Sequence, residues 1–125
     1  MRLLLDTQVV LWQLSGERSL SEVAQEAIAR ADDLLFSVAS FAEIGIKAAI
    51  GKLKVPETLA ERVADAGVRT LALSAEHGLT VAKLPMHHRD PFDRLLIAQA
   101  MIEGLTIVTS DRRFAQYAVP LVDAA

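Results

Sequence analysis

Short apolar runs alternate with segments of helical character along the whole chain. Parallel strands that are buried on both faces read as such continuous apolar runs, and helices connect one strand to the next. The alternation therefore predicts an α/β fold, a single domain over residues 1–125 with a mostly parallel sheet. Strands are expected at 3–5, 34–38, 68–73, 105–109 and 119–122.

Helix-start and helix-stop residues predict what lies between these strands. Ser19, with Glu22 three residues later, is a capping-box pattern for a helix through about Arg30. Further helices are expected over about 40–50, 56–66 and 91–103, after Ser74, and briefly after Asp111.

Composition excludes several classes of protein. No apolar stretch reaches the roughly 18 residues that a membrane span needs. Asp6 and Gln8 interrupt the first apolar run too early for a signal peptide. Because the chain has no cysteine, disulfides and thiolate metal sites are excluded, and a cytosolic location is expected.

The charge balance does not by itself point to nucleic acid. The net charge is −3 and the pI is near 5.5, whereas proteins that hold nucleic acid by bulk electrostatics are usually basic. If the protein acts on RNA, a local positive patch or a bound metal must offset this acidity.

Four acidic residues stand outside the polar helix faces and loops that hold most of the others. Asp6 ends the first apolar run, and Asp111 follows the fourth after one serine. Glu43 and Asp93 lie near the starts of two expected helices, each on a face shared with apolar residues. All four are expected at the carboxyl edge of the sheet, where parallel α/β folds bind ligands.

Burying several converging carboxylates without a partner costs several kcal/mol, and one divalent cation can neutralise them together. With oxygen ligands only, Mg²⁺ or Mn²⁺ fits best. Zinc is disfavoured, because cysteine is absent and His77, His87 and His88 lack metal-ligand spacing. Such a site suits hydrolysis of a phosphodiester.

Each of the four acids also has a purely structural interpretation, as a helix cap or an ion pair. Glu43 could form a capping box with Ser40 or an i,i+4 ion pair with Lys47. A place at the start of a helix is equally open to Asp6, Asp90, Asp93 and Asp111. A shared site is favoured, because four coincidental caps at one sheet edge are less expected than one site.

Four segments carry a family resemblance, in order and spacing, from end to end of the chain. They are 4–7 (LLDT), 37–44 (SVASFAEI), 88–100 (HRDPFDRLLIAQA) and 105–111 (LTIVTSD). With these segments the chain resembles the PIN-domain family, and within it the VapC-type toxins of bacterial toxin–antitoxin pairs.

The resemblance implies a single PIN-like domain with a five-stranded, mostly parallel sheet flanked by helices on both faces. It also implies Mg²⁺- or Mn²⁺-dependent cleavage of single-stranded RNA, and the choice of RNA over DNA rests on the resemblance alone. The family's catalytic and metal-binding acids map onto Asp6, Glu43, Asp93 and Asp111, which leaves Asp90 as a helix cap. A small antitoxin protein and a second copy of the chain are the implied protein partners.

Arginines near these acids are candidates for binding RNA phosphates. The candidates for substrate contact are Arg89, Arg94 and Arg112, and Arg113 flanks the acids in the same way. Trp12 is expected in the core or at a dimer contact rather than as a platform for a base.

Two rival functions remain open. One is a PIN-like nuclease for RNA maturation that has no antitoxin. The other is a non-catalytic binding module, in which the four acids serve only as caps or ion pairs and bind no divalent metal.

Overall fold

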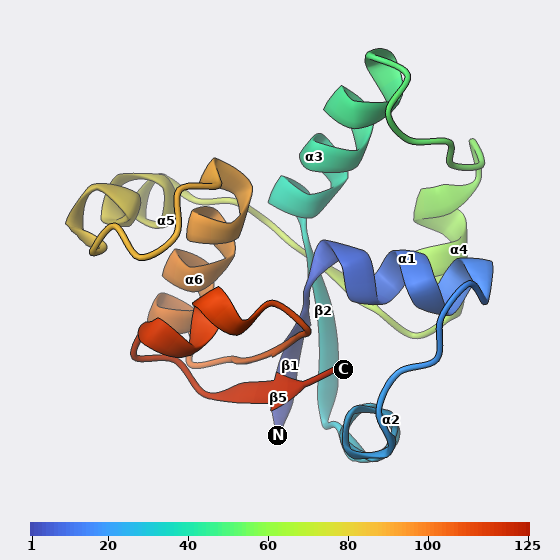
Figure 1. Ribbon diagram of the computed structural model, residues 1–125, viewed down its shortest axis with the longest axis horizontal. Helices are drawn as coiled ribbons and strands as arrows, with labels where there is room; N and C mark the ends of the chain where they lie inside the picture. The colour runs from blue at the N-terminus through green and yellow to red at the C-terminus, as the bar shows by residue number, and fades with distance from the viewer.

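A five-stranded sheet forms the centre of the computed structural model, which describes residues 1–125 (Figure 1). Every pair of neighbouring strands is parallel, and the order is β3-β2-β1-β4-β5. The strands are β1 (Arg2–Leu5), β2 (Asp33–Ser37), β3 (Arg69–Leu71), β4 (Thr106–Thr109) and β5 (Leu121–Asp123). The expected α/β fold and all five predicted strands are confirmed, with small shifts at the strand ends.

Helices connect the strands at nearly every crossover. The α-helices are α1 (Thr7–Ser15), α2 (Glu22–Arg30), α3 (Val38–Ala49), α4 (Leu59–Asp65), α5 (Ala75–Thr80) and α6 (Pro91–Glu103). Two short 3₁₀ helices, η1 (Val81–Lys83) and η2 (Arg112–Gln116), follow α5 and β4. None of these helices has the length and apolarity that crossing a membrane requires.

The two faces of the sheet carry separate cores, because successive side chains of a strand point in opposite directions. Leu3 and Leu5 pack with apolar residues of α1, α2, α3 and α4, whereas Leu4 packs with α6. Figure 1 shows α1, α2 and α4 on one side of the strands and α5 and α6 on the other. The helices therefore cover both faces, as expected.

Three helix starts differ from the sequence prediction. α4 begins at Leu59 rather than at Pro56, without a side-chain cap, and capping serines set the other two starts. Ser21, not Ser19, caps α2, because its hydroxyl accepts a hydrogen bond from the Ala24 amide. The helix expected from about residue 40 starts at Val38, because Ser37 at the end of β2 caps it through the Ala39 amide. In α2 and α3, the helix begins where a serine oxygen accepts a hydrogen bond from a free amide of the first turn.

The carboxyl edge of the sheet brings distant parts of the chain together. The central strand β1 lies between β2 and β4, and Leu5 pairs with Val108. The first and fourth strands are thus neighbours in the sheet. The residues that follow β1 and β4, and the start of the helix that follows β2, consequently meet at one edge.

The central strand generates a stability prediction. Leu4→Ala removes a side chain that is 0% exposed, so the free energy of unfolding should fall by about 2–5 kcal/mol. Leu79→Ala is the matched control, because Leu79 is 75% exposed and its loss should cost less than about 0.5 kcal/mol. Urea unfolding measures both, and equal losses would contradict the assignment of Leu4 to the core.

Candidate functional site

A cleft of about 600 Å³ opens at the carboxyl edge of the sheet. All four acids predicted from the sequence line it: Asp6, Glu43, Asp93 and Asp111. They come from the end of β1, from α3, from α6 and from the turn after β4. The fold therefore brings together residues that lie far apart in the sequence.

Asp6 is fixed by hydrogen bonds from both neighbouring elements. Its Oδ1 accepts from the Thr7 amide at 2.8 Å, and its Oδ2 accepts from the Thr109 hydroxyl at 2.8 Å. The same hydroxyl accepts from the Asp111 amide at 3.0 Å, so one threonine links two of the acids. Burial raises the pKa of Asp6 from 3.8 to about 6, although the hydrogen bonds from Thr109 and Thr7 oppose the rise.

Glu43 is buried and only partly satisfied. Its Oε2 accepts from Lys47 at 2.8 Å, as the predicted ion pair requires. Its Oε1 is buried without any hydrogen-bond partner. The alternative capping box with Ser40 does not form, because Ser37 caps α3 and the Ser40 hydroxyl accepts from Thr7. A buried carboxylate oxygen without a partner is costly, which points to a missing positive ligand.

Asp93 lies in the first turn of α6 without serving as its cap. Asp90 is the cap, because its Oδ1 accepts from the amides of Phe92 and Asp93, as predicted. Burial and then repulsion by nearby carboxylates, Asp6 first, raise the pKa of Asp93 from 3.8 to about 8. The rise in pKa is thus larger for Asp93 than for Asp6.

His88 has no metal-ligand spacing in the sequence, but in the fold its side chain lies between two of the acids. Its Nε2 is 2.8 Å from Oδ2 of Asp93 and 3.2 Å from Oδ2 of Asp111, and the side chain is 1% exposed. Its Nδ1 accepts from the Asp90 amide at 3.2 Å, so the proton of the neutral ring belongs on Nε2. His88 therefore donates to the carboxylates, and this hydrogen bonding disfavours a role as metal ligand.

Asp111 differs electrostatically from Asp93 although both contact His88. Its two oxygens accept from Nε and Nη2 of Arg113 at 3.0 and 2.8 Å. This guanidinium holds the pKa of Asp111 below its ordinary value. Asp111 also caps η2 through the Arg113 amide, so its structural interpretation holds beside its place in the cleft.

The donor set fits a hard divalent cation. Carboxylate oxygens of Asp93 and Asp111 lie within 4.8 Å of each other, and the unpaired oxygen of Glu43 belongs to the same cleft. Carboxylate oxygens predominate, which suits Mg²⁺ or Mn²⁺. A bound cation would also relieve the repulsion that raises the pKa of Asp93.

The structure does not support the expected phosphate contact at Arg94. Its side chain is buried, and its guanidinium donates to four backbone carbonyls and one phenol. These acceptors belong to Val81, Leu84, Pro85, His88 and Tyr117. Arg94 holds the loop that carries His88, a role that only the folded chain reveals.

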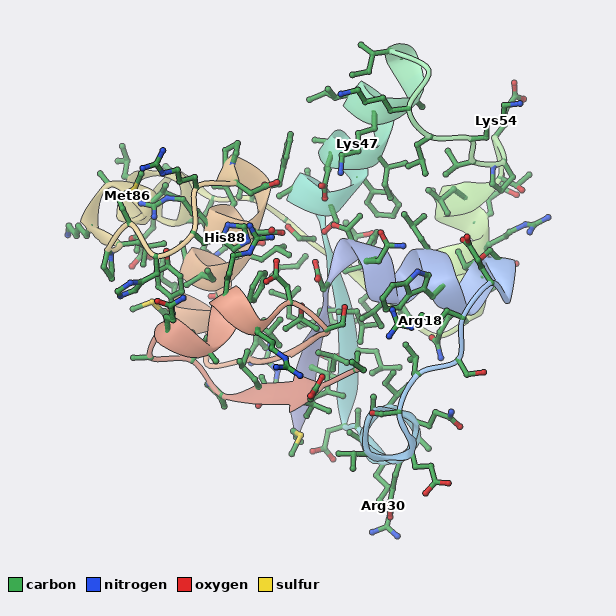
Figure 2. The ribbon with its side chains drawn as sticks, in the orientation of Figure 1. Arg18, Arg30, Lys47, Lys54, Met86 and His88 are labelled. Carbon is green, nitrogen blue, oxygen red and sulfur yellow. The ribbon has the colours of Figure 1, made fainter.

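Two further predicted arginines, Arg89 and Arg112, lie outside the cleft, whereas Arg113 lines it. Arg89 is exposed and does not line it, and Arg112 lines a neighbouring hollow. The cations that do line the cleft are Arg18, Lys47, Lys52 and Arg113. Arg18 and Lys52 were not predicted, because they are remote in sequence from the four acids and only the fold brings them near. Lys47 was expected only as the ion-pair partner of Glu43. Figure 2 shows Lys47 on α3, Arg18 beside α1 and His88 near the start of α6.

Known proteins resemble this chain along nearly its full length. The PIN domain model matches residues 3–120. Ribonuclease VapC22 of Mycobacterium tuberculosis is 34% identical, and the match covers 94% of this chain and 92% of that protein.

Two solved complexes share the fold. VapBC2 of Rickettsia felis, bound to a DNA fragment of its promoter, has a TM-score of 0.74 at 17% identity and full coverage of both chains. DNA-bound VapBC of Salmonella typhimurium has a TM-score of 0.72 at 14% identity, with 98% of both chains covered. Together with the family match over nearly the whole sequence, these likenesses show that the chain belongs to the PIN-domain family.

Proposed function

We propose that this protein is a divalent-metal-dependent endoribonuclease and the toxin of a type II toxin–antitoxin pair. The observation that carries the proposal is the convergence of four carboxylates in one cleft, one of them with a buried, unpartnered oxygen. The similarity to Ribonuclease VapC22 supports RNA as the substrate. The finer parts of the proposal are that the RNA is single-stranded and that the cation is Mg²⁺ or Mn²⁺.

In the proposed site, some residues would hold the cation and others orient the residues that hold it. Asp6, Glu43, Asp93 and Asp111 would hold the cation, directly or through water. When bound, a divalent cation supplies charge neutralisation at a phosphate and lowers the pKa of a coordinated water. Thr109 and the Thr7 amide orient the Asp6 carboxylate, and His88 keeps Asp93 and Asp111 close together.

Protein partners follow from the relatives. The structural neighbours are VapBC complexes, which supports a small antitoxin as the partner of this chain. A homodimer is also proposed, with Ile46 of α3 and Ile50, which directly follows α3, as candidates for the contact; they are 54% and 62% exposed. Co-purification with the neighbouring gene product tests the first proposal, and the molar mass in solution tests the second. The expected location remains the cytosol.

The rival functions make different predictions. A PIN nuclease of RNA maturation would cleave RNA in vitro, but its expression alone would not arrest growth. A non-catalytic binding module would bind no divalent metal, and acid-to-amide changes would alter only its stability.

The acids can be tested by amide substitution. Asp6→Asn and Asp93→Asn should each lower the rate of single-stranded RNA cleavage in Mg²⁺ or Mn²⁺ by about 100-fold or more, because each removes a charge that holds the cation. EDTA should abolish cleavage by the wild type. Rates on a labelled oligonucleotide, with protein freed of any partner, measure this.

Asp65→Asn is the matched control, because Asp65 is exposed on α4 outside the cleft. It should cleave like the wild type. Cleavage that survives EDTA, or folded Asp6→Asn and Asp93→Asn proteins with undiminished rates, would overturn the metal-carboxylate assignment.

The raised pKa values predict how the metal-free protein responds to pH. Unfolded, Asp6 and Asp93 lose their protons near pH 3.8, whereas burial raises the folded pKa values to about 6 and about 8. Between these limits the folded state binds more protons, so the free energy of unfolding falls as pH rises. Asp93→Asn removes the larger contribution and should show a smaller fall between about pH 5 and about pH 8.

Urea unfolding in EDTA at both pH values measures this difference. Asp65→Asn should keep the wild-type fall, because its carboxylate is exposed. If the Asp93→Asn protein loses as much stability as the wild type over this range, the raised pKa of Asp93 is wrong.

A further inference from the structure

Trp12 lines the same cleft as the four acids and is the only tryptophan of the chain. It lies on α1, half-buried, with its inner side packed against the core. α1 ends at Gly16, whose φ of +68° lies in the left-handed region and reverses the chain direction. The reversal brings Arg18 over the indole, with the guanidinium carbon 4.5 Å from the ring centroid.

The charges of the cleft leave Arg18 available for a ligand. Lys47 and Arg113 are paired with Glu43 and Asp111 inside the cleft. Arg18 and Lys52, by contrast, line the cleft without an ion pair to any carboxylate. The cleft therefore combines carboxylates with two unpaired cations, Arg18 and Lys52, and the guanidinium of Arg18 lies over the ring of Trp12.

We propose that the Trp12–Arg18 pair is a base-binding subsite, which stacks one unpaired base of the RNA whose phosphodiester lies at the acids. This inference rests on the proposed ribonuclease function and deepens it. Aromatic rings and guanidinium planes stack on any base, so the subsite recognises single-stranded nucleic acid without reading its sequence. A base inside a duplex is covered on both faces by its neighbours and cannot stack there.

A nucleic acid fits this surface better than a peptide does. The phosphates of a polyanion match the unpaired Arg18 and Lys52, and a planar base matches the indole and guanidinium. The same two cations offer a basic peptide segment no charge partner at this end of the cleft. The sequence predicts Trp12 in the core or at a dimer contact, and its packing against the core agrees with the first of these. Its place in the cleft beside Arg18 is the reason for the base platform proposed here, which the sequence analysis did not favour.

Because Trp12 is the only tryptophan, its fluorescence reports directly on the subsite. The Asp6→Asn protein, in which cleavage is expected to be strongly slowed, is titrated with three ligands of equal length: single-stranded RNA, the same RNA as a duplex, and an abasic ribose-phosphate strand. Single-stranded RNA should quench the fluorescence to saturation. The duplex and the abasic strand should leave it nearly unchanged, because neither offers a base for stacking.

Kinetics separate binding from chemistry. Arg18→Ala and Trp12→Leu should raise KM for single-stranded RNA roughly tenfold and leave kcat nearly unchanged. Trp12→Phe keeps an aromatic ring and should recover most of the loss. Arg30→Ala is the matched control for Arg18, because Arg30 points away from the molecule at the end of α2 and pairs only with Glu26 (Figure 2).

The possible results distinguish a failure of the base-binding subsite from a failure of the proposed ribonuclease function. If the wild type cleaves RNA but the abasic strand quenches equally, or KM is unchanged in a folded Arg18→Ala protein, the subsite is wrong and the nuclease stands. Quenching by an antitoxin peptide but not by RNA would assign the pair to a protein interface and overturn the proposal. If the wild type cleaves no RNA, the proposed function itself fails.

Discussion

Burial of like charges at the carboxyl edge of the central strands is the constraint on which the rest of the site depends. Desolvation and mutual repulsion raise the pKa values of Asp6 and Asp93, so an isolated cluster of this kind would cost stability. The chain offsets part of that cost with its own groups, namely Thr109, His88, Lys47 and Arg113. What they leave unsatisfied is a buried oxygen of Glu43 and the charge of Asp93, and a divalent cation would satisfy both.

The hydrogen bonds that cap the helices also position the carboxylates of the cleft. Asp6 and Asp111 each use an oxygen to cap the helix that follows, which fixes the carboxylate at the mouth of the cleft. Asp90 caps α6 and also fixes the His88 ring, because its side chain accepts amides while its own amide donates to Nδ1. The structural interpretation of these acids therefore does not compete with the functional one.

The sequence predicted the sheet and the four acids because both depend on local pattern. Apolar runs mark buried parallel strands, and an acid directly after such a run must lie at the carboxyl edge. It did not predict His88, Arg94 or Arg18, whose roles depend on contacts with residues distant in the chain or on the reversal at Gly16. Arg94 shows why such contacts are missed. Its place beside an acid in the sequence suggests a phosphate-binding residue, but in the fold it is buried and donates hydrogen bonds to five acceptors.

The most direct test of the metal site is a crystal structure of the protein grown with Mn²⁺, with the ion located by its anomalous scattering. The account predicts a peak in the cleft with oxygens of Asp6 and Asp93 as ligands at roughly 2.0–2.2 Å and with His88 still hydrogen-bonded to the carboxylates. A cleft without a peak at saturating Mn²⁺, or an ion bound to Nε2 of His88 in place of the aspartates, would contradict it.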